Sequence, residues 1–173
     1  PIAPPRPATS RAGCGAADPF GTPGVTADAF PGYLDELERE GRRAAETFGM
    51  LLLPGLELSW NDLDPDNAAH AVAVGLRRHV SLEDGLEVAL EEAAGAGAAL
   101  VAAHPFADEP DPVPERRTRR FSQDPALRRL VHRYELFNRT TLFGWVAAEG
   151  LPAVATGDFH RLKHLAGWKT MVP

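Results

Sequence analysis

The chain has 173 residues and a mass of 18.6 kDa, which suits one domain with a single hydrophobic core. Hydrophobic residues make up 44% and charged residues 24% of the chain, a balance that excludes a disordered or fibrous protein. The net charge of -6 makes duplex nucleic acid a poor partner, because a protein that neutralises phosphates needs an excess of positive charge.

The single cysteine, Cys14, excludes an internal disulfide bond and a thiolate-rich metal site. The sequence has no apolar run of about 18 residues, the length that a transmembrane helix requires, and its first residues lack the apolar core of a signal peptide. We therefore expect a cytoplasmic protein that has no membrane partner.

Residues 1–24 are rich in Pro, Ala and Gly, so we predict a linker or flexible loop there and place the folded domain at 25–173. Beyond the linker, amphipathic segments alternate with short apolar runs that end in turn residues. We predict helices at 26–48, 81–95, 125–133 and 140–149, and strands at 50–60, 70–75, 98–103, 134–138 and 151–156. The Pro- and charge-rich stretch 106–123 is long for a simple connection, and we expect a surface excursion that can act as a lid.

The alternation of strands and helices indicates an α/β fold. The apolar runs show no period of two, which favours strands covered by helices on both faces. This pattern predicts a parallel sheet, either open or closed into a barrel.

Metal-ligating side chains stand at or beside the predicted strand ends. They are Glu57, His70, His104, Asp158 and His160. The carboxyl ends of parallel strands form the ligand-binding face of an α/β sheet, so we expect His104, Asp158 and His160 to converge there. Imidazole and carboxylate together suit zinc, manganese or iron, and the Asp-x-His spacing suits two neighbouring ions.

Each of these residues also has a structural interpretation. Glu57 stands between two leucines in a predicted buried strand, where a carboxylate is costly unless it is paired or binds a metal. A lone histidine beside an apolar strand, such as His70, is more often a hydrogen-bonded structural residue. The remaining histidines lie in charged contexts, and we expect them at the surface: His79, His132 and His164.

The ordered segments PGLELS, HAVAVG, AAHP, YELFN and ATGDFH resemble the motifs of the PHP (polymerase and histidinol phosphatase) family of metal-dependent phosphoesterases, over about residues 50–161. The resemblance implies a distorted, TIM-like (β/α) barrel with two or three divalent ions (Zn, Mn or Fe) in its mouth. It implies that Glu57 bridges metal ions, that His104, Asp158 and His160 are ligands, and that His70 is a further ligand with a weaker match. Glu135 and Asn138 match the family's Glu-x-x-Asn strand, and the resemblance implies that they lie in the pocket or behind the ligands rather than binding the metal directly.

The chain departs from the family at its front, because the family opens with a His-x-His pair and this sequence has no histidine before His70. One interpretation is an N-terminally incomplete barrel, which would expose strand edges and apolar surface and favour an oligomer. The other interpretation is a degenerate, non-catalytic PHP-like scaffold or interaction domain.

The function that the resemblance implies is hydrolysis of a phosphate ester by metal-activated water. The substrate would be a small phosphorylated metabolite, a nucleotide or a short oligonucleotide, held by Asn138 and by Arg139 and Arg161, which follow two of the motifs. The arginines of 115–120 can also cover the mouth. An amidohydrolase acting on C–N bonds is a weaker alternative, because both lysines of the chain follow the last motif.

Overall fold

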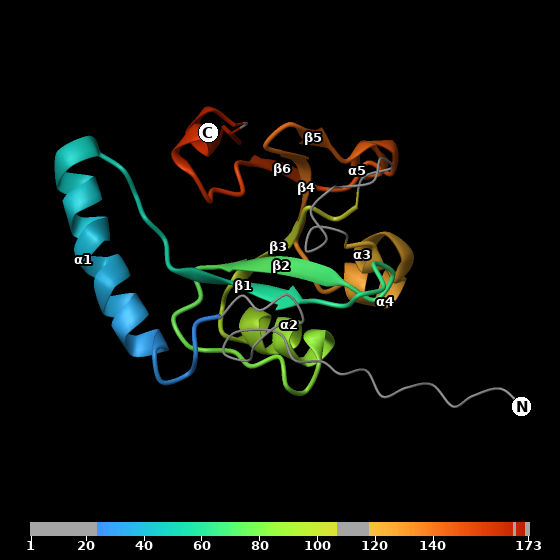
Figure 1. Ribbon diagram of the computed structural model, residues 1–173, viewed down its shortest axis with the longest axis horizontal. Helices are drawn as coiled ribbons and strands as arrows, with labels where there is room; N and C mark the ends of the chain where they lie inside the picture. The colour runs from blue at the N-terminus through green and yellow to red at the C-terminus, as the bar shows by residue number, and fades with distance from the viewer. Residues whose placement is uncertain (1–23, 107–117, 168, 172–173) are drawn as a thin grey trace, which may run out of the picture.

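The computed structural model describes residues 24–106, 118–167 and 169–171, so most of the predicted linker and of the predicted lid lies outside the described residues. Figure 1 shows the order of the elements. The helices are α1 (Phe30–Phe48), α2 (Leu86–Gly95), α3 (Arg120–Gln123), α4 (Pro125–Arg128) and α5 (Gly144–Ala148), with a 3-10 helix at Leu162–Ala166. The strands are β1 (Gly55–Trp60), β2 (Ala69–Val74), β3 (Ala99–Ala103), β4 (Arg133–Asn138), β5 (Thr141–Leu142) and β6 (Ala153–Thr156).

The six strands form one open, mixed sheet in the order β1-β2-β3-β4-β5, with β6 paired to β4. The β1–β2, β2–β3 and β4–β5 pairs are antiparallel, and only β3–β4 and β4–β6 are parallel. The predicted parallel sheet closed into a TIM-like (β/α) barrel is therefore wrong for the described residues. The connection 61–68 gives one physical reason, since it is shorter than the crossover of about a dozen residues that a parallel pair needs.

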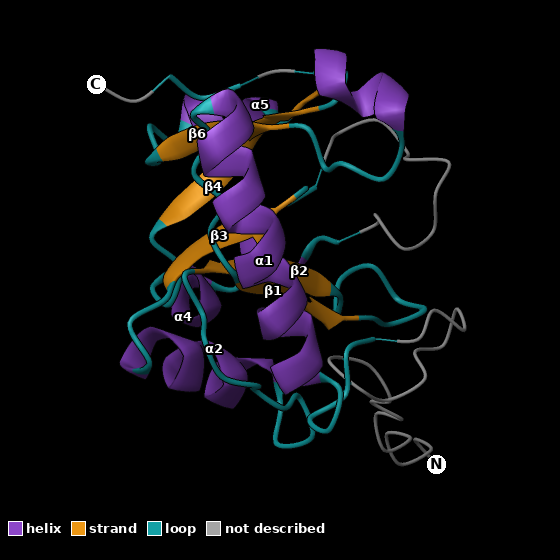
Figure 2. Cartoon of the chain, turned by 90° about the vertical axis from the view of Figure 1, so that its left-hand side faces the viewer, coloured by secondary structure: helices purple, strands orange, loops and turns teal. Residues whose placement is uncertain are grey.

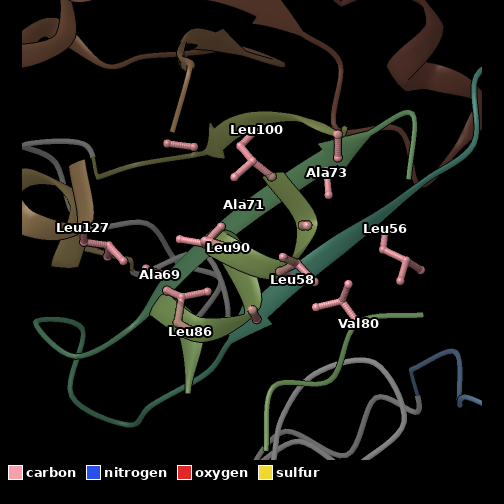
Figure 3. Close-up of a cluster of buried hydrophobic side chains, with 14 of the residues drawn as sticks. Leu56, Leu58, Ala69, Ala71, Ala73, Val80, Leu86, Leu90, Leu100 and Leu127 are labelled. Atoms are coloured by element: carbon pink, nitrogen blue, oxygen red, sulfur yellow. The ribbon is translucent and has the colours of Figure 1, made fainter. Parts of the chain in front are cut away.

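One face of β1, β2 and β3 packs on α2 to form the hydrophobic core (Figure 3). Side chains alternate between the two faces of a strand, so every second residue of these strands points to the helix. The core face of the strands carries Leu56, Leu58, Ala71, Ala73, Leu100 and Ala102, and α2 contributes Leu86, Ala89, Leu90 and Ala93. In both overall views α2 lies on the side of the molecule away from β6 and α5 (Figure 2).

Among the described residues, no helix covers the opposite face of the same strands, whereas the sequence predicted helices on both faces. It presents Glu57, Val72, Val74, Val101 and Ala103 to a cavity that is described below. Because the residues on this face are mostly valine and alanine, both faces are apolar and the period of two is hidden in the sequence. The prediction that helices cover both faces of the sheet is therefore wrong. It failed because the strand residues that line the cavity are as apolar as the residues that face the core.

Most predicted elements are confirmed with shifted bounds. Helix α1 ends at Phe48 and is followed by Gly49, whose φ of +63° is the left-handed conformation that glycine adopts at helix C-termini. Helix α2 begins at Leu86 rather than at 81, and the hydroxyl of Ser81 accepts a hydrogen bond from the N–H of Glu83 instead of capping the helix. The strand predicted over 50–60 begins only at Gly55.

Helix α1 contacts the rest of the protein mainly through its first turns. Phe30 is buried, and the Tyr33 hydroxyl donates a hydrogen bond of 2.7 Å to the carbonyl oxygen of Gly55. After the helix, Met50 and Leu51 are 57% and 81% exposed.

No helix among the described residues is long and apolar enough to cross a membrane.

Candidate metal centre

The register of the sheet brings together three of the predicted ligands. Ser59 lies opposite His70 in the β1–β2 pair, so Glu57, two residues earlier on the same face, is the diagonal neighbour of His70. His70 in turn lies opposite Ala103 in the β2–β3 pair, and His104 follows directly. Two antiparallel pairings therefore place a carboxylate and two imidazoles at one point of the sheet.

The three side chains meet at one carboxylate oxygen. Oε1 of Glu57 lies 2.9 Å from Nδ1 of His70 and 3.7 Å from Nε2 of His104. One ligand atom from each residue lies within 4.8 Å of the other two, which is close enough for all three to bind one ion. Both histidines are buried, whereas the Glu57 side chain is 37% exposed, so the group can be reached from solvent.

Each histidine has a second partner on the ring nitrogen that faces away from Glu57. Nε2 of His70 lies 2.7 Å from the amide oxygen Oδ1 of the buried Asn61. Nδ1 of His104 lies 3.4 Å from the hydroxyl of Thr118, which donates a 2.6 Å hydrogen bond to the carbonyl oxygen of His104. Outer partners of this kind orient histidine ligands and select their tautomer. Neither Asn61 nor Thr118 was predicted from the sequence.

The electrostatics of the group favour an ionised Glu57 carboxylate beside a neutral His70 imidazole. Burial acts to raise the pKa of Glu57, but hydrogen bonds from His104 and His70 outweigh it and hold that pKa well below its ordinary value. Burial also lowers the pKa of His70, although the hydrogen bond to Glu57 opposes the shift. These are the protonation states that metal ligands need.

A cavity of about 390 Å³ opens beside the group. Besides Glu57 and His104, it contains four other residues that the sequence predicted for the site, namely Glu135, Asn138, Asp158 and His160. His70 is not among the residues that line the cavity. The remaining lining residues are Val72, Val74, Val101, Ala103, Thr156 and Phe159. Predicted ligands from β1, β3 and the segment after β6 thus share one cavity.

Asp158 and His160 contact each other, and both contact Arg139. They are not part of the group formed by Glu57, His70 and His104. Nη2 of Arg139 lies 2.9 Å from Oδ2 of Asp158, and the guanidinium also donates to the Asp158 carbonyl oxygen. Nδ1 of His160 lies 3.1 Å from Oδ1 of Asp158. Arg139, predicted to hold substrate, is therefore engaged with Asp158, and Arg161 is exposed at the start of the 3-10 helix.

Glu135, in the middle of β4, joins three strand ends at the base of the cavity. Its Oε2 accepts hydrogen bonds from the backbone N–H of His104 at 2.7 Å and from the Asn138 amide at 2.6 Å. Its Oε1 accepts a hydrogen bond from the Thr156 hydroxyl at 2.5 Å. The carboxylate is only 3% exposed, and these three donors compensate its burial.

Backbone strain in the described part of the chain gathers around this cavity. The non-glycine residues with positive φ there are His104 (+29°), Phe106 (+92°), Arg139 (+53°) and Asp158 (+39°). Each is a residue of the site or lies within two residues of one. Such conformations are costly and occur mostly at functional sites, where the surrounding structure holds them in place.

The histidines expected at the surface have structural contacts of their own. Nδ1 of His132 accepts a 2.8 Å hydrogen bond from the N–H of Leu100, and the His79 ring packs edge-on against Phe30. Nδ1 of His164 accepts a hydrogen bond from the N–H of His160. The expected surface position is confirmed for His132, which is exposed, and holds only in part for His79 and His164, which are half-buried.

The described arginines of the 115–120 run bind acidic side chains outside the cavity. Arg119 pairs with Asp66 at 3.3 Å, and Arg120 pairs with Glu87 on α2. The remaining arginines of the run lie outside the described residues.

In comparisons with known proteins, no protein-family model matches the chain and no curated protein is similar to it.

Proposed function

We propose that this protein is a metal-dependent phosphoesterase whose first metal ion is held by Glu57, His70 and His104. The observation that carries the proposal is the way both buried imidazoles turn toward a single carboxylate oxygen. The similarity of the motifs to the PHP family supports phosphate esters as the substrate class. The proposal does not depend on a barrel fold, because it rests on three side chains that the open sheet brings together.

The hydrogen bonds of His70 support a cation in this place. A neutral imidazole has one N–H. A metal ion at Oε1 of Glu57 would take the lone pair of Nδ1, and the N–H of the neutral ring would then lie on Nε2, where the amide oxygen of Asn61 at 2.7 Å can accept it. Without the ion, Nδ1 donates to Oε1 at 2.9 Å instead, which is one of the hydrogen bonds that hold the pKa of Glu57 down.

His104 repeats this arrangement from the other side. Its Nδ1 lies beside the hydroxyl of Thr118, which already donates its proton to a carbonyl oxygen and can accept one from the ring. With the proton on Nδ1, the lone pair of Nε2 would be available to an ion bound at Oε1 of Glu57, which lies 3.7 Å away. Two nitrogen ligands and one oxygen ligand with solvent access resemble the open sites of catalytic zinc, and manganese or iron suit the same donors.

The cavity also collects negative charge. The carboxylates of Glu57, Glu135 and Asp158 all line it, and Arg139 pairs with one of them, Asp158. Bringing carboxylates together costs free energy unless cations compensate them. A bound divalent ion accounts for the cluster and also provides a site for a phosphate group.

The described residues have separate tasks in the proposed reaction. Glu57, His70 and His104 hold the ion, and a divalent ion bound there supplies an activated water and the positive charge that stabilises phosphoryl oxygens. Because Arg139 pairs with Asp158, we assign Asp158 and His160 to the substrate side of the cavity. The Arg139 guanidinium at 2.9 Å and the Asp158 carboxylate at 3.1 Å hold the His160 ring at Nδ1, so its Nε2 can donate a proton to the leaving oxygen.

The test is a metal analysis of the purified chain followed by an assay with p-nitrophenyl phosphate and bis(p-nitrophenyl) phosphate. We expect a divalent ion to co-purify, chelation to abolish hydrolysis, and Zn²⁺ or Mn²⁺ to restore it. A metal-free, inactive chain would instead favour the scaffold interpretation. Hydrolysis of C–N substrates without phosphatase activity would point to the amidohydrolase alternative.

A further inference from the structure

We propose that Glu135 is a positioning residue of the metal centre: it is not a ligand, and its carboxylate fixes the backbone of His104 so that the ring faces Glu57. This inference rests on the proposed function, because it concerns the same metal ion. It assigns a separate role to a carboxylate that lines the cavity together with the proposed ligands.

His104 needs such support because its backbone is strained. It follows the last residue of β3 and has a φ of +29°, a conformation that non-glycine residues rarely adopt. A side chain with a strained backbone keeps its direction only when other groups hold the neighbouring peptide groups. Relaxation of φ to negative values would rotate the imidazole away from Glu57.

The support comes from side chains on both sides of the residue. Oε2 of Glu135 accepts a 2.7 Å hydrogen bond from the N–H of His104, and the hydroxyl of Thr118 donates a 2.6 Å bond to its carbonyl oxygen. Glu135 is itself fixed by the amide of Asn138 and the hydroxyl of Thr156. Glu135 thus links the ends of β3, β4 and β6 by hydrogen bonds and fixes the position of His104 relative to these strands.

The same contacts argue against Glu135 as a ligand. Both carboxylate oxygens already accept hydrogen bonds, and Oε2 accepts two of them. Glu135 is also not among the described residues whose ligand atoms lie within reach of one another. Its carboxylate therefore acts through His104.

Two substitutions separate the positioning role from ligation. In Glu135→Gln the amide oxygen can accept the bonds from His104 and Asn138, while the amide nitrogen faces the Thr156 hydroxyl, which can act as the acceptor. In Glu135→Leu all three bonds are lost. Glu91→Leu, on the exposed side of α2, controls for the loss of a surface carboxylate.

The experiment is a Co²⁺ titration of the full chain, followed by the visible absorption bands that report the geometry of the ion, with thermal unfolding as the check on folding. We expect Glu135→Gln to bind Co²⁺ within about threefold of wild type with unchanged bands, and Glu135→Leu to bind about 10–100-fold more weakly with altered bands, the range found for outer partners of metal ligands. A loss in Glu135→Gln as large as in Glu57→Gln would identify Glu135 as a ligand and overturn the inference. Wild-type binding in Glu135→Leu would overturn it as well.

A second measurement keeps the inference separate from the proposed function. The nitrogen chemical shifts of the histidine rings, measured by NMR in the metal-free chain, report the tautomer and hydrogen bonding of His104. We expect Glu135→Leu to change the His104 signals and Glu135→Gln to leave them in place. If wild type binds no Co²⁺, the proposed function fails, whereas unchanged His104 signals in Glu135→Leu refute the positioning role itself.

Discussion

Replacing Glu57 by Gln is the most direct perturbation of the proposed metal centre. Oε1 of Glu57 is the common neighbour of both imidazoles, at 2.9 Å from His70 and 3.7 Å from His104. The substitution keeps the shape of the side chain and removes its negative charge. We therefore expect Glu57→Gln to weaken metal binding strongly while the fold remains intact.

The magnitude follows from the number of donors. Structural zinc sites with four ligands bind with about 10–16 kcal/mol, or roughly 3 kcal/mol for each ligand. A neutral amide oxygen is a poor substitute for an ionised carboxylate, and about 3 kcal/mol corresponds to roughly a hundredfold change in affinity. We expect a Kd for Co²⁺ about 100-fold higher in Glu57→Gln than in wild type.

The assay is competitive Co²⁺ titration against a chromogenic chelator at neutral pH, with hydrolysis of p-nitrophenyl phosphate measured on the same samples. Glu91→Gln is the matched control, because Glu91 is an exposed residue of α2 away from the cavity. We expect the control to behave as wild type. Affinity within threefold of wild type in Glu57→Gln, or an equal loss in the control, would refute the assignment of Glu57.

The remaining predictions concern stability. Because burial lowers the pKa of His70, the folded chain binds that proton less readily than the unfolded chain, and the stabilisation present above about pH 6.5 is lost as the pH falls. Without metal, the Tm of wild type should therefore exceed the Tm of His70→Gln by more at pH 7 than at pH 5. An equal Tm difference at both pH values would contradict this prediction. Leu58→Ala, at a fully buried position, should lower the free energy of unfolding by about 2–5 kcal/mol in chemical denaturation, whereas Leu63→Ala, 82% exposed, should change it by less than about 0.5 kcal/mol. His132→Ala leaves the N–H of Leu100 without its acceptor and should cost about 1 kcal/mol in the same measurement.

The positions of the strands could be predicted because short apolar runs end at turn residues, but their directions could not. The runs at 70–75 and 98–103 both form strands, β2 and β3. Their pairing is antiparallel although α2 lies between them in the sequence, so a helix between two strands did not make a parallel crossover. The direction of a strand depends on the edge at which the chain re-enters the sheet, and the hydropathy pattern contains no information about that edge.

The candidate ligands could be identified because their chemistry is unusual in its context. A carboxylate between Leu56 and Leu58 has few structural uses, and the alternation of a strand then places it on the face opposite the core. Convergence on the carboxyl ends of parallel strands was the wrong reason for the prediction. Glu57 and His70 meet because the strands β1 and β2 run in opposite directions and place them diagonally across one pair.

Asn61 and Thr118 could not be predicted, because their roles come only from contacts made in three dimensions. Asn61 lies in a stretch whose composition is typical of turns, and Thr118 follows a run of charges; neither residue type is unusual there. Asn61 contacts a ring nine residues away, and Thr118 binds a backbone carbonyl oxygen 14 residues away. Outer partners of this kind orient histidine ligands, so the residues hardest to predict are those that support the predicted ones.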